Sequence, residues 1–251
     1  HAAACGAFDA EGRLLAQSET GAPGLGFALL GVVGRFLEVL KLGSGQGKES
    51  FQIGDAFVSS DPAVTSGQPR DLAVLTPLFR GPALVGFAAS TGRAGGAGLL
   101  ASGQLQDATP VPVTVLVRGG VVVESATELL RRSDVCQRGE VVGDAFAMLA
   151  CNDLAARRVG ELLADLGCQD LRPLADYICA ASRGAVVRSL EARPELHGVW
   201  SYELASQHKQ HGGRPEKRGG GGQEAATPAL AATLRVAPGG VEVDVGPSHG
   251  G

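Results

Sequence analysis

The chain has 251 residues, of which 44% are hydrophobic and only 4% are aromatic, and its formal net charge is −4 at pH 7. A chain of this length and composition can bury a core, but that core must be built mainly from Ala, Val and Leu. The acidic balance excludes the concentrated positive field that nucleic-acid binding requires, so no nucleic-acid partner is expected.

The first half of the chain predicts a hairpin, a helix and a pair of buried strands. Residues 3–17 alternate apolar and polar side chains around the turn sequence DAEG, which indicates a β-hairpin. Residues 26–41 follow as a helix whose apolar run is interrupted by Arg35 and is too short to cross a bilayer, so no membrane association is expected. The predicted strands at 71–79 and 83–90 are continuous apolar runs, which indicates that both faces of their sheet are covered.

The second half predicts two further strands and two long helices. Residues 91–103 contain five glycines and cannot form a stable regular element by themselves. Residues 110–125 supply two strand candidates around RGG, and helices are expected at 142–166 and 171–192. The second helix should end before Pro194, because a residue that precedes proline is pushed out of the α region.

The C-terminal part predicts a linker and a final hairpin. Residues 204–226 are rich in Gly and Lys and indicate a flexible linker, and LAATLRVAPGGVEVDV then reads as two strands about a turn. We therefore expect an α+β fold with a mixed β-sheet core, packed helices and a C-terminal β-rich region. The expected domains are an N-terminally incomplete α+β domain at 1–203, the linker at 204–226 and the start of the β-rich region at 227–251.

The cysteines indicate free thiols rather than a disulfide framework or a zinc site. They are widely separated, odd in number and without a CxxC pair: Cys5, Cys136, Cys151, Cys168 and Cys179. No signal peptide is visible, so the expected location is a reducing cytoplasm.

Three ordered blocks of sequence resemble the hydantoinase B/oxoprolinase family. The run GDAFVSSDPAVTSGQPRDLAVLTPLF resembles the family's GDVFLLNDPYRGGTHLPDVTVVTPVF without a gap. The upstream run CGAFDAEGRLLAQSE and the downstream run GDAFAMLACNDLAARRVGELLADLG resemble further family segments, and together the blocks cover roughly residues 3–203. Because the opening HAAACGAFDAEG resembles the middle of the family's N-terminal part, the chain is expected to be a fragment or a truncated reading frame.

The resemblance implies a large subunit that works with a second, ATP-using subunit. Family members include ATP-dependent hydrolases of cyclic amides such as 5-oxoproline and N-methylhydantoin, and carboxylases of acetone and acetophenone. The implied partner is a hydantoinase A-like ATP-binding subunit, and the complex acts on a small-molecule substrate. ATP is expected only through that partner, because GRAGGAG is not followed by the Lys-Ser/Thr of a P-loop.

The resemblance also implies a metal site, yet this chain lacks the family's histidines there. The residues at the five matching positions are Thr20, Gly24, Gln68, Arg93 and Ala94, and no histidine occurs between residues 2 and 196. What survives is an oxygen-only set of Glu19, Asp61 and Asp71, which would hold Mg²⁺ or Mn²⁺ weakly. Structural roles are favoured for Asp61 and Asp71, since one suits a turn and the other precedes a strand.

No catalytic residue can be assigned from the sequence. Cys5 lies where the family also has a cysteine, but a thiol among apolar strand residues is usually inert. Ser59, Ser60 and Ser66 have no neighbouring histidine to act as a base. His208 and His211 have a metal-compatible spacing but fall in the polar linker.

Three hypotheses remain open, so the sequence does not decide whether the chain is itself an enzyme. In the first, the chain is a family subunit with a degenerate centre and a structural role, in a cyclic-amide hydrolase or in a carboxylase-like complex. In the second, it is an active hydrolase with a carboxylate-only metal site, and in the third it is a truncated gene product without function.

Overall fold

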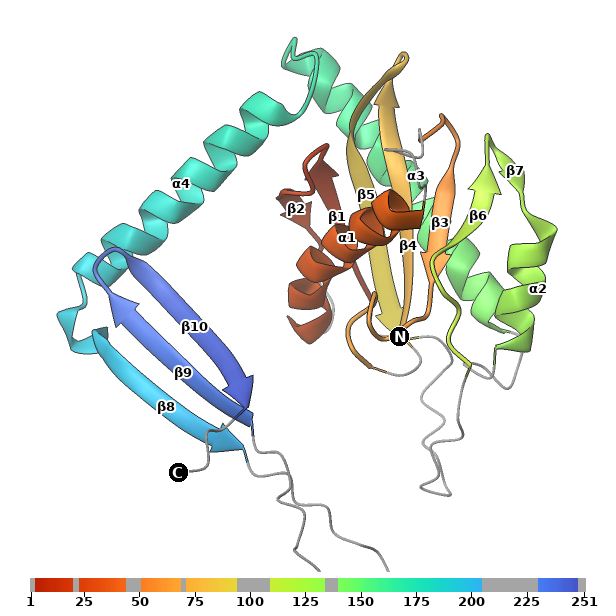
Figure 1. Ribbon diagram of the computed structural model, residues 1–251. Coiled ribbons are helices and arrows are strands. Elements are labelled where there is room, and N and C mark those ends of the chain that lie inside the picture. The colour runs from red at the N-terminus through yellow and green to blue at the C-terminus, as the bar shows by residue number, and fades with distance from the viewer. Residues whose placement is uncertain are drawn as a thin grey trace, which may run out of the picture. The chain divides into compact units, whose positions relative to one another are not determined.

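The computed structural model describes residues 3–19, 23–43, 51–68, 71–93, 109–133, 140–204 and 230–247. The chain divides into two compact units, residues 1–178 and 179–251, and each contains helical segments and an antiparallel sheet (Figure 1). The fold is α+β, which confirms the predicted class.

A seven-stranded antiparallel sheet forms the centre of the first unit, in the order β2-β1-β5-β4-β3-β6-β7. The strands are β1 (Ala3–Asp9), β2 (Leu14–Gln17), β3 (Ala56–Ser59), β4 (Asp71–Arg80), β5 (Ala83–Arg93), β6 (Thr114–Arg118) and β7 (Val121–Val122). The predicted hairpin is β1–β2, and the two predicted buried strands are β4 and β5. The strand β3 was not predicted, because its four residues are too few for a periodic pattern.

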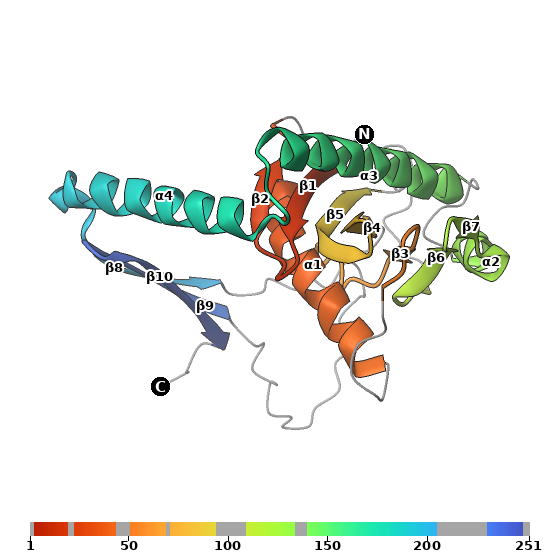
Figure 2. The same ribbon diagram turned by 90° about the horizontal axis from the view of Figure 1, so that it is seen from above.

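Helices cover both faces of this sheet (Figure 2). Helix α1 (Pro23–Gly43) lies on one face and helix α3 (Glu140–Asp165) on the other, while α2 (Glu124–Arg132) packs beside β6. The second strand expected within 110–125 is only the two-residue β7, since α2 begins at Glu124. None of the described helices is long and apolar enough to cross a membrane.

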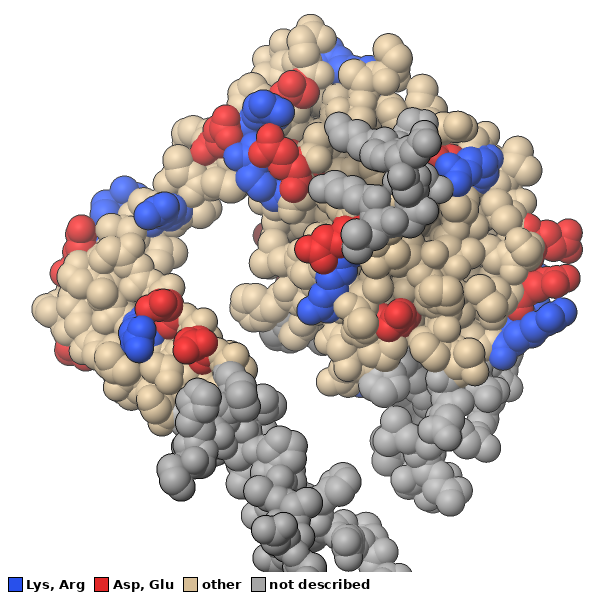
Figure 3. Space-filling model, viewed as in Figure 1, with Lys and Arg blue, Asp and Glu red and all other residues tan. Residues whose placement is uncertain are grey.

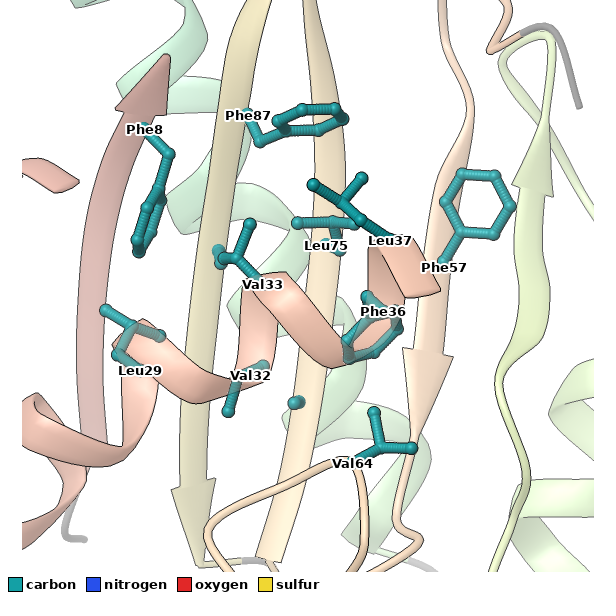
Figure 4. Close-up of a cluster of buried hydrophobic side chains, with 12 residues drawn as sticks. Phe8, Leu29, Val32, Val33, Phe36, Leu37, Phe57, Val64, Leu75 and Phe87 are labelled. Atoms are coloured by element: carbon teal, nitrogen blue, oxygen red, sulfur yellow. The ribbon is translucent and has the colours of Figure 1, made fainter. Parts of the chain in front are cut away.

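Alternate residues of the central strands supply two separate apolar layers. Leu75 of β4 and Phe87 of β5 point to the α1 side, where they pack with Phe8, Phe36 and Phe57 (Figure 4). Their neighbours in the strands belong to clusters on the α3 side. The continuous apolar runs of β4 and β5 therefore reflect burial on both faces, as the sequence predicted.

The second unit contains the end of a helix and a small antiparallel sheet. Helix α4 (Arg172–Glu191) crosses the boundary between the units, and the short 3₁₀ helix η1 (Pro194–Leu196) follows it. The sheet has the order β10-β9-β8, with β8 (Gly198–Leu204), β9 (Leu230–Ala237) and β10 (Gly240–Pro247). Strand β8 pairs with β9. The expected domain limits of 1–203, 204–226 and 227–251 stay a prediction.

Candidate functional site

The start of β4 and the end of β5 bring together residues at the positions of the missing histidines. Asp71 and Arg93 are directly paired across the two strands, and Arg93 Nε donates to Asp71 Oδ1 at 3.3 Å. Arg93 Nη2 donates to Gln68 Oε1 at 2.8 Å, and Ser66 Oγ donates to Asp71 Oδ2. We call these four residues, Ser66, Gln68, Asp71 and Arg93, the Asp71 corner.

The loop after β3 delivers Ser66 and Gln68 to this corner. The carbonyl oxygen of Asp61 accepts hydrogen bonds from the backbone N–H groups of Val64 and Thr65, which closes one tight turn. Gly67 then has φ of +84°, a conformation that favours glycine. The backbone N–H of Asp71 donates a hydrogen bond to the carbonyl oxygen of Gln68 at 3.3 Å. The loop is thus folded back onto the beginning of β4.

The bonding in the Asp71 corner does not suit a divalent cation. Asp71 is completely buried, and each of its carboxylate oxygens already accepts a hydrogen bond. A guanidinium repels another cation 4 Å away by about 4 kcal/mol per unit charge at an effective dielectric of 20. Mg²⁺ and Mn²⁺ prefer about six oxygen ligands, whereas the side chains of this corner offer one carboxylate, one amide and one hydroxyl, and all three take part in hydrogen bonds within the corner.

The other two acidic candidates lie elsewhere in the loops. Asp61 is partly exposed, and its Oδ1 accepts the backbone N–H of Ala63 at 2.9 Å, as a turn residue does. Glu19 is exposed after the end of β2. Within the described residues, no three His, Cys, Asp or Glu side chains form a group that could hold a metal ion. The assignment of Glu19, Asp61 and Asp71 as metal ligands stays a prediction.

The candidate serines take part in structural hydrogen bonds. Ser59 Oγ donates to the carbonyl of Val111 at 2.9 Å, and Ser60 Oγ accepts the N–H of Val111 at 2.8 Å. Both serines are nearly fully buried, and they fix the strand end of β3 to the segment that leads into β6. Ser66 donates to Asp71 within the corner already described.

Sequence reasoning located the corner but missed its bonding. The motif positions marked Gln68 and Arg93 as substitutes for histidines, yet no local signal indicates that Arg93 reaches both Gln68 and Asp71. Thr20, Ala94, His208, His211, most of the glycine-rich stretch 91–103 and most of the linker 204–226 lie outside the described residues.

Comparisons with known proteins agree with the arrangement of the fold. A family model described as Hydantoinase B/oxoprolinase matches residues 1–249. Among curated proteins, none matches the chain. Two solved structures are similar: the ATP-dependent caprolactamase from Pseudomonas jessenii, with a TM-score of 0.64, and an acetone carboxylase in its nucleotide-free form, with a TM-score of 0.65.

Those two likenesses concern the fold, because the sequences are only 16% identical to this chain in each case. The matches cover 98% and 96% of this chain. They cover 40% of the caprolactamase chain and 32% of the carboxylase chain. The chain therefore spans less than half the length of either solved protein.

Proposed function

The chain belongs to the hydantoinase B/oxoprolinase family, and we propose that it is a subunit of an ATP-dependent hydrolase of cyclic amides of the hydantoin or 5-oxoproline type. In this proposal the chain has a structural role, and its own centre is degenerate. The catalytic step takes place in the assembly as a whole, on a small-molecule substrate.

The bonding of Arg93 is the observation that carries the proposal of a degenerate centre. At one of the positions where the resemblance implies a histidine ligand, this chain places a permanent cation that bonds to the buried Asp71. Gln68, at another such position, accepts a hydrogen bond from the same guanidinium. The groups that would face a metal ion thus bind a side chain of the protein, which supports a structural use of this corner.

The proposed partner is a hydantoinase A-like ATP-binding subunit in the cytoplasm. The two solved structures named above are of ATP-dependent enzymes, whereas this sequence contains no nucleotide-binding motif. A separate source of ATP chemistry is therefore required for the proposed reaction.

A metal-binding experiment tests the degenerate centre. Equilibrium dialysis against Mn²⁺ should show no stoichiometric binding by the unaltered chain, and the Asp71→Ala variant should behave in the same way. The double variant Gln68→His/Arg93→His removes the guanidinium and supplies two imidazoles beside Asp71, so it should gain Mn²⁺ or Zn²⁺ binding. One tightly bound Mn²⁺ per unaltered chain, lost in Asp71→Ala but kept in the exposed control Asp153→Asn, would instead establish a metal site.

A reconstitution experiment tests the partner. The chain is co-expressed with a hydantoinase A-like ATP-binding subunit, and we expect the two to co-purify and to hydrolyse a cyclic amide with release of ADP. The Asp71→Asn variant should retain that turnover if the corner is structural. Failure of the subunits to associate would contradict the proposal.

A subunit of an acetone or acetophenone carboxylase-like complex is the second candidate. It is favoured by the solved acetone carboxylase, whose likeness to this chain is as strong as that of the caprolactamase. The same reconstituted complex distinguishes the two functions. ADP release that requires bicarbonate and a ketone supports the carboxylase, and ADP release that requires only a cyclic amide supports the hydrolase.

A further inference from the structure

Two cysteines that are distant in the sequence have neighbouring side chains in the first unit. Cys5 lies in β1 and Cys151 lies in α3, and both are free and partly buried. The two thiols are close enough to interact electrostatically. The pKa of the Cys5 thiol is raised, chiefly by burial and then by its interaction with Cys151, while a hydrogen bond with Ser18 acts in the opposite direction.

Bonds that do not involve sulfur hold the two thiols in this position. The cross-strand partner of Cys5 is Ser90, whose Oγ donates to Asn152 Oδ1 at 2.6 Å. Asn152 follows Cys151 in α3, and its Nδ2 donates to the carbonyl of Val74 at 3.1 Å. The helical turn that carries Cys151 is therefore fixed above the row of the sheet that carries Cys5.

The backbone of Cys5 is fixed as well. Its N–H donates to Ser18 Oγ at 3.3 Å, and the N–H of Ser18 donates to the carbonyl of Cys5 at 2.8 Å. Neither thiol has a role in the function proposed above. Within the described residues, the other free thiols are Cys168, which is partly exposed, and Cys179, which is exposed.

We propose that Cys5 and Cys151 are an oxidisable dithiol, which a peroxide converts to a disulfide that links β1 to α3. In the first step a thiolate sulfur attacks the O–O bond of hydrogen peroxide, an S–O bond forms, and hydroxide leaves. In the second step the other sulfur attacks the sulfenic acid, the S–S bond forms, the S–O bond breaks, and water leaves. Two thiols lose two electrons and two protons overall, and one peroxide is reduced to two waters.

Only the thiolate is nucleophilic, so the burial that raises the pKa of the Cys5 thiol slows a first attack by this sulfur. The bonds formed and broken are the same whichever sulfur attacks first. A dithiol of this kind remains reduced in a resting cytoplasm and forms the disulfide only under oxidative stress.

Peptide mapping of the full chain tests this proposal. The reduced protein is treated with one equivalent of hydrogen peroxide, its remaining thiols are alkylated, and a proteolytic digest is analysed without reduction. We expect a cross-linked peptide that contains Cys5 and Cys151, with a mass lower by two hydrogen atoms than the sum of its parts, and dithiothreitol should separate it. A Cys136→Ser background removes a thiol that could exchange with the pair.

Matched variants test the identity of the two sulfurs. Cys168→Ser and Cys179→Ser should leave the cross-link unchanged, because these residues are outside the pair. In Cys5→Ser and in Cys151→Ser the cross-link should be lost, and a dimedone adduct should accumulate on the remaining cysteine of the pair. The unaltered protein decides the proposal even if a variant does not fold: Cys5 and Cys151 that remain fully alkylated after Cys168 or Cys179 has been oxidised would overturn it.

Discussion

Asp9, Asp55 and Asp71 are the buried carboxylates of the described chain, and each is paired with an arginine. Asp9 accepts the backbone N–H and the Nε of Arg13 at 2.8 and 2.7 Å. Asp55 accepts the N–H of Gly119 and the Nη1 of Arg118, both at 2.9 Å. A buried carboxylate that also accepts a backbone N–H fixes a turn or a strand end, so Asp9 and Asp55 serve the fold.

Gly54 provides a test of backbone packing beside Asp55. It has φ of +84°, and a Cβ at this position would lie 2.6 Å from the backbone nitrogen of Gly120. We expect Gly54→Ala to reduce the free energy of unfolding by more than about 2 kcal/mol, since left-handed strain of about 1–2 kcal/mol adds to a backbone clash. Urea denaturation measures this loss.

Gly67→Ala is the matched control for that substitution. Gly67 has the same φ of +84°, but a Cβ there would meet nothing within 4 Å. Only the strain of about 1–2 kcal/mol should remain. Equal losses for the two variants would show that the approach of Gly120 contributes nothing.

The Cys5 thiol should make stability depend on alkaline pH. Its pKa in the folded chain lies above the 9.0 of an unperturbed thiol, so between these two values the unfolded chain has lost a proton that the folded chain retains. The free energy of unfolding should therefore fall as the pH rises above about 9.

The comparison with Cys5→Ser isolates this effect. Both proteins are unfolded in urea under reducing conditions from about pH 7 to pH 10, and the variant should show the shallower decrease above pH 9. Parallel curves for the two proteins would mean that the environment of Cys5 does not perturb its ionisation.

Among the elements, α3 is joined to the sheet by a buried polar group as well as by apolar packing. Asn152 is 1% exposed; it accepts a hydrogen bond from Ser90 and donates to the carbonyl of Val74 and to the hydroxyl of Thr76. These bonds reach both β4 and β5, and they fix the rotation of the helix over the strands. Apolar side chains alone specify such a rotation less strictly, because their contacts have no direction.

Replacement of Asn152 by Ala should weaken the attachment of α3. The change leaves buried groups without partners, at about 1–3 kcal/mol for each, so we expect roughly 2–4 kcal/mol of lost stability. Thermal and urea unfolding measure the loss. Asp153→Ala in the next, exposed position of the same helix is the control and should change stability by less than about 1 kcal/mol.

The small sheet of the second unit is amphipathic across all its strands. Trp200, Leu234 and Val243 are aligned in register on one face, and they are 47%, 37% and 63% exposed. The opposite face carries the aligned polar pair Arg235 and Glu242, whose charged groups are 3.3 Å apart. This alternation with a period of two explains why the final hairpin was predictable from sequence.

On the face of the molecule shown in Figure 3, acidic and basic side chains are intermixed over the surface.

The two compact units differ in the spectroscopic signals that report on them. Trp200 is the single tryptophan of the chain and lies in the second unit, whereas the large apolar clusters belong to the first. Tryptophan fluorescence therefore reports on the second unit, and far-ultraviolet circular dichroism reports on the whole chain.

This difference allows the units to be tested for independent unfolding. Leu75 is completely buried in the first unit, and Leu75→Ala should cost about 2–5 kcal/mol there. In urea, the variant should shift the main transition seen by circular dichroism and leave the transition seen by Trp200 fluorescence in place. Equal shifts of the two signals would show that the chain unfolds as one cooperative unit.

Elements with a long pattern were predictable from the amino-acid sequence alone, and so was the family, because its motifs occur in order. The apolar runs of β4 and β5, the alternation in β1–β2 and β9–β10, and the long helices α1, α3 and α4 were readable because each repeats its signal over many residues. The absence of histidine between residues 2 and 196 was equally plain.

Which side chains contact each other depends on how the chain folds in three dimensions. The brief elements β3 and α2 depend on partners elsewhere in the chain, so their few residues carried no sufficient pattern. The bonds from Arg93 to Asp71 and Gln68, and the contact of Cys5 with Cys151, join residues that are brought together by strand pairing and helix packing. Long-range contacts of this kind arise from the path of the whole backbone, and no local window of sequence specifies them.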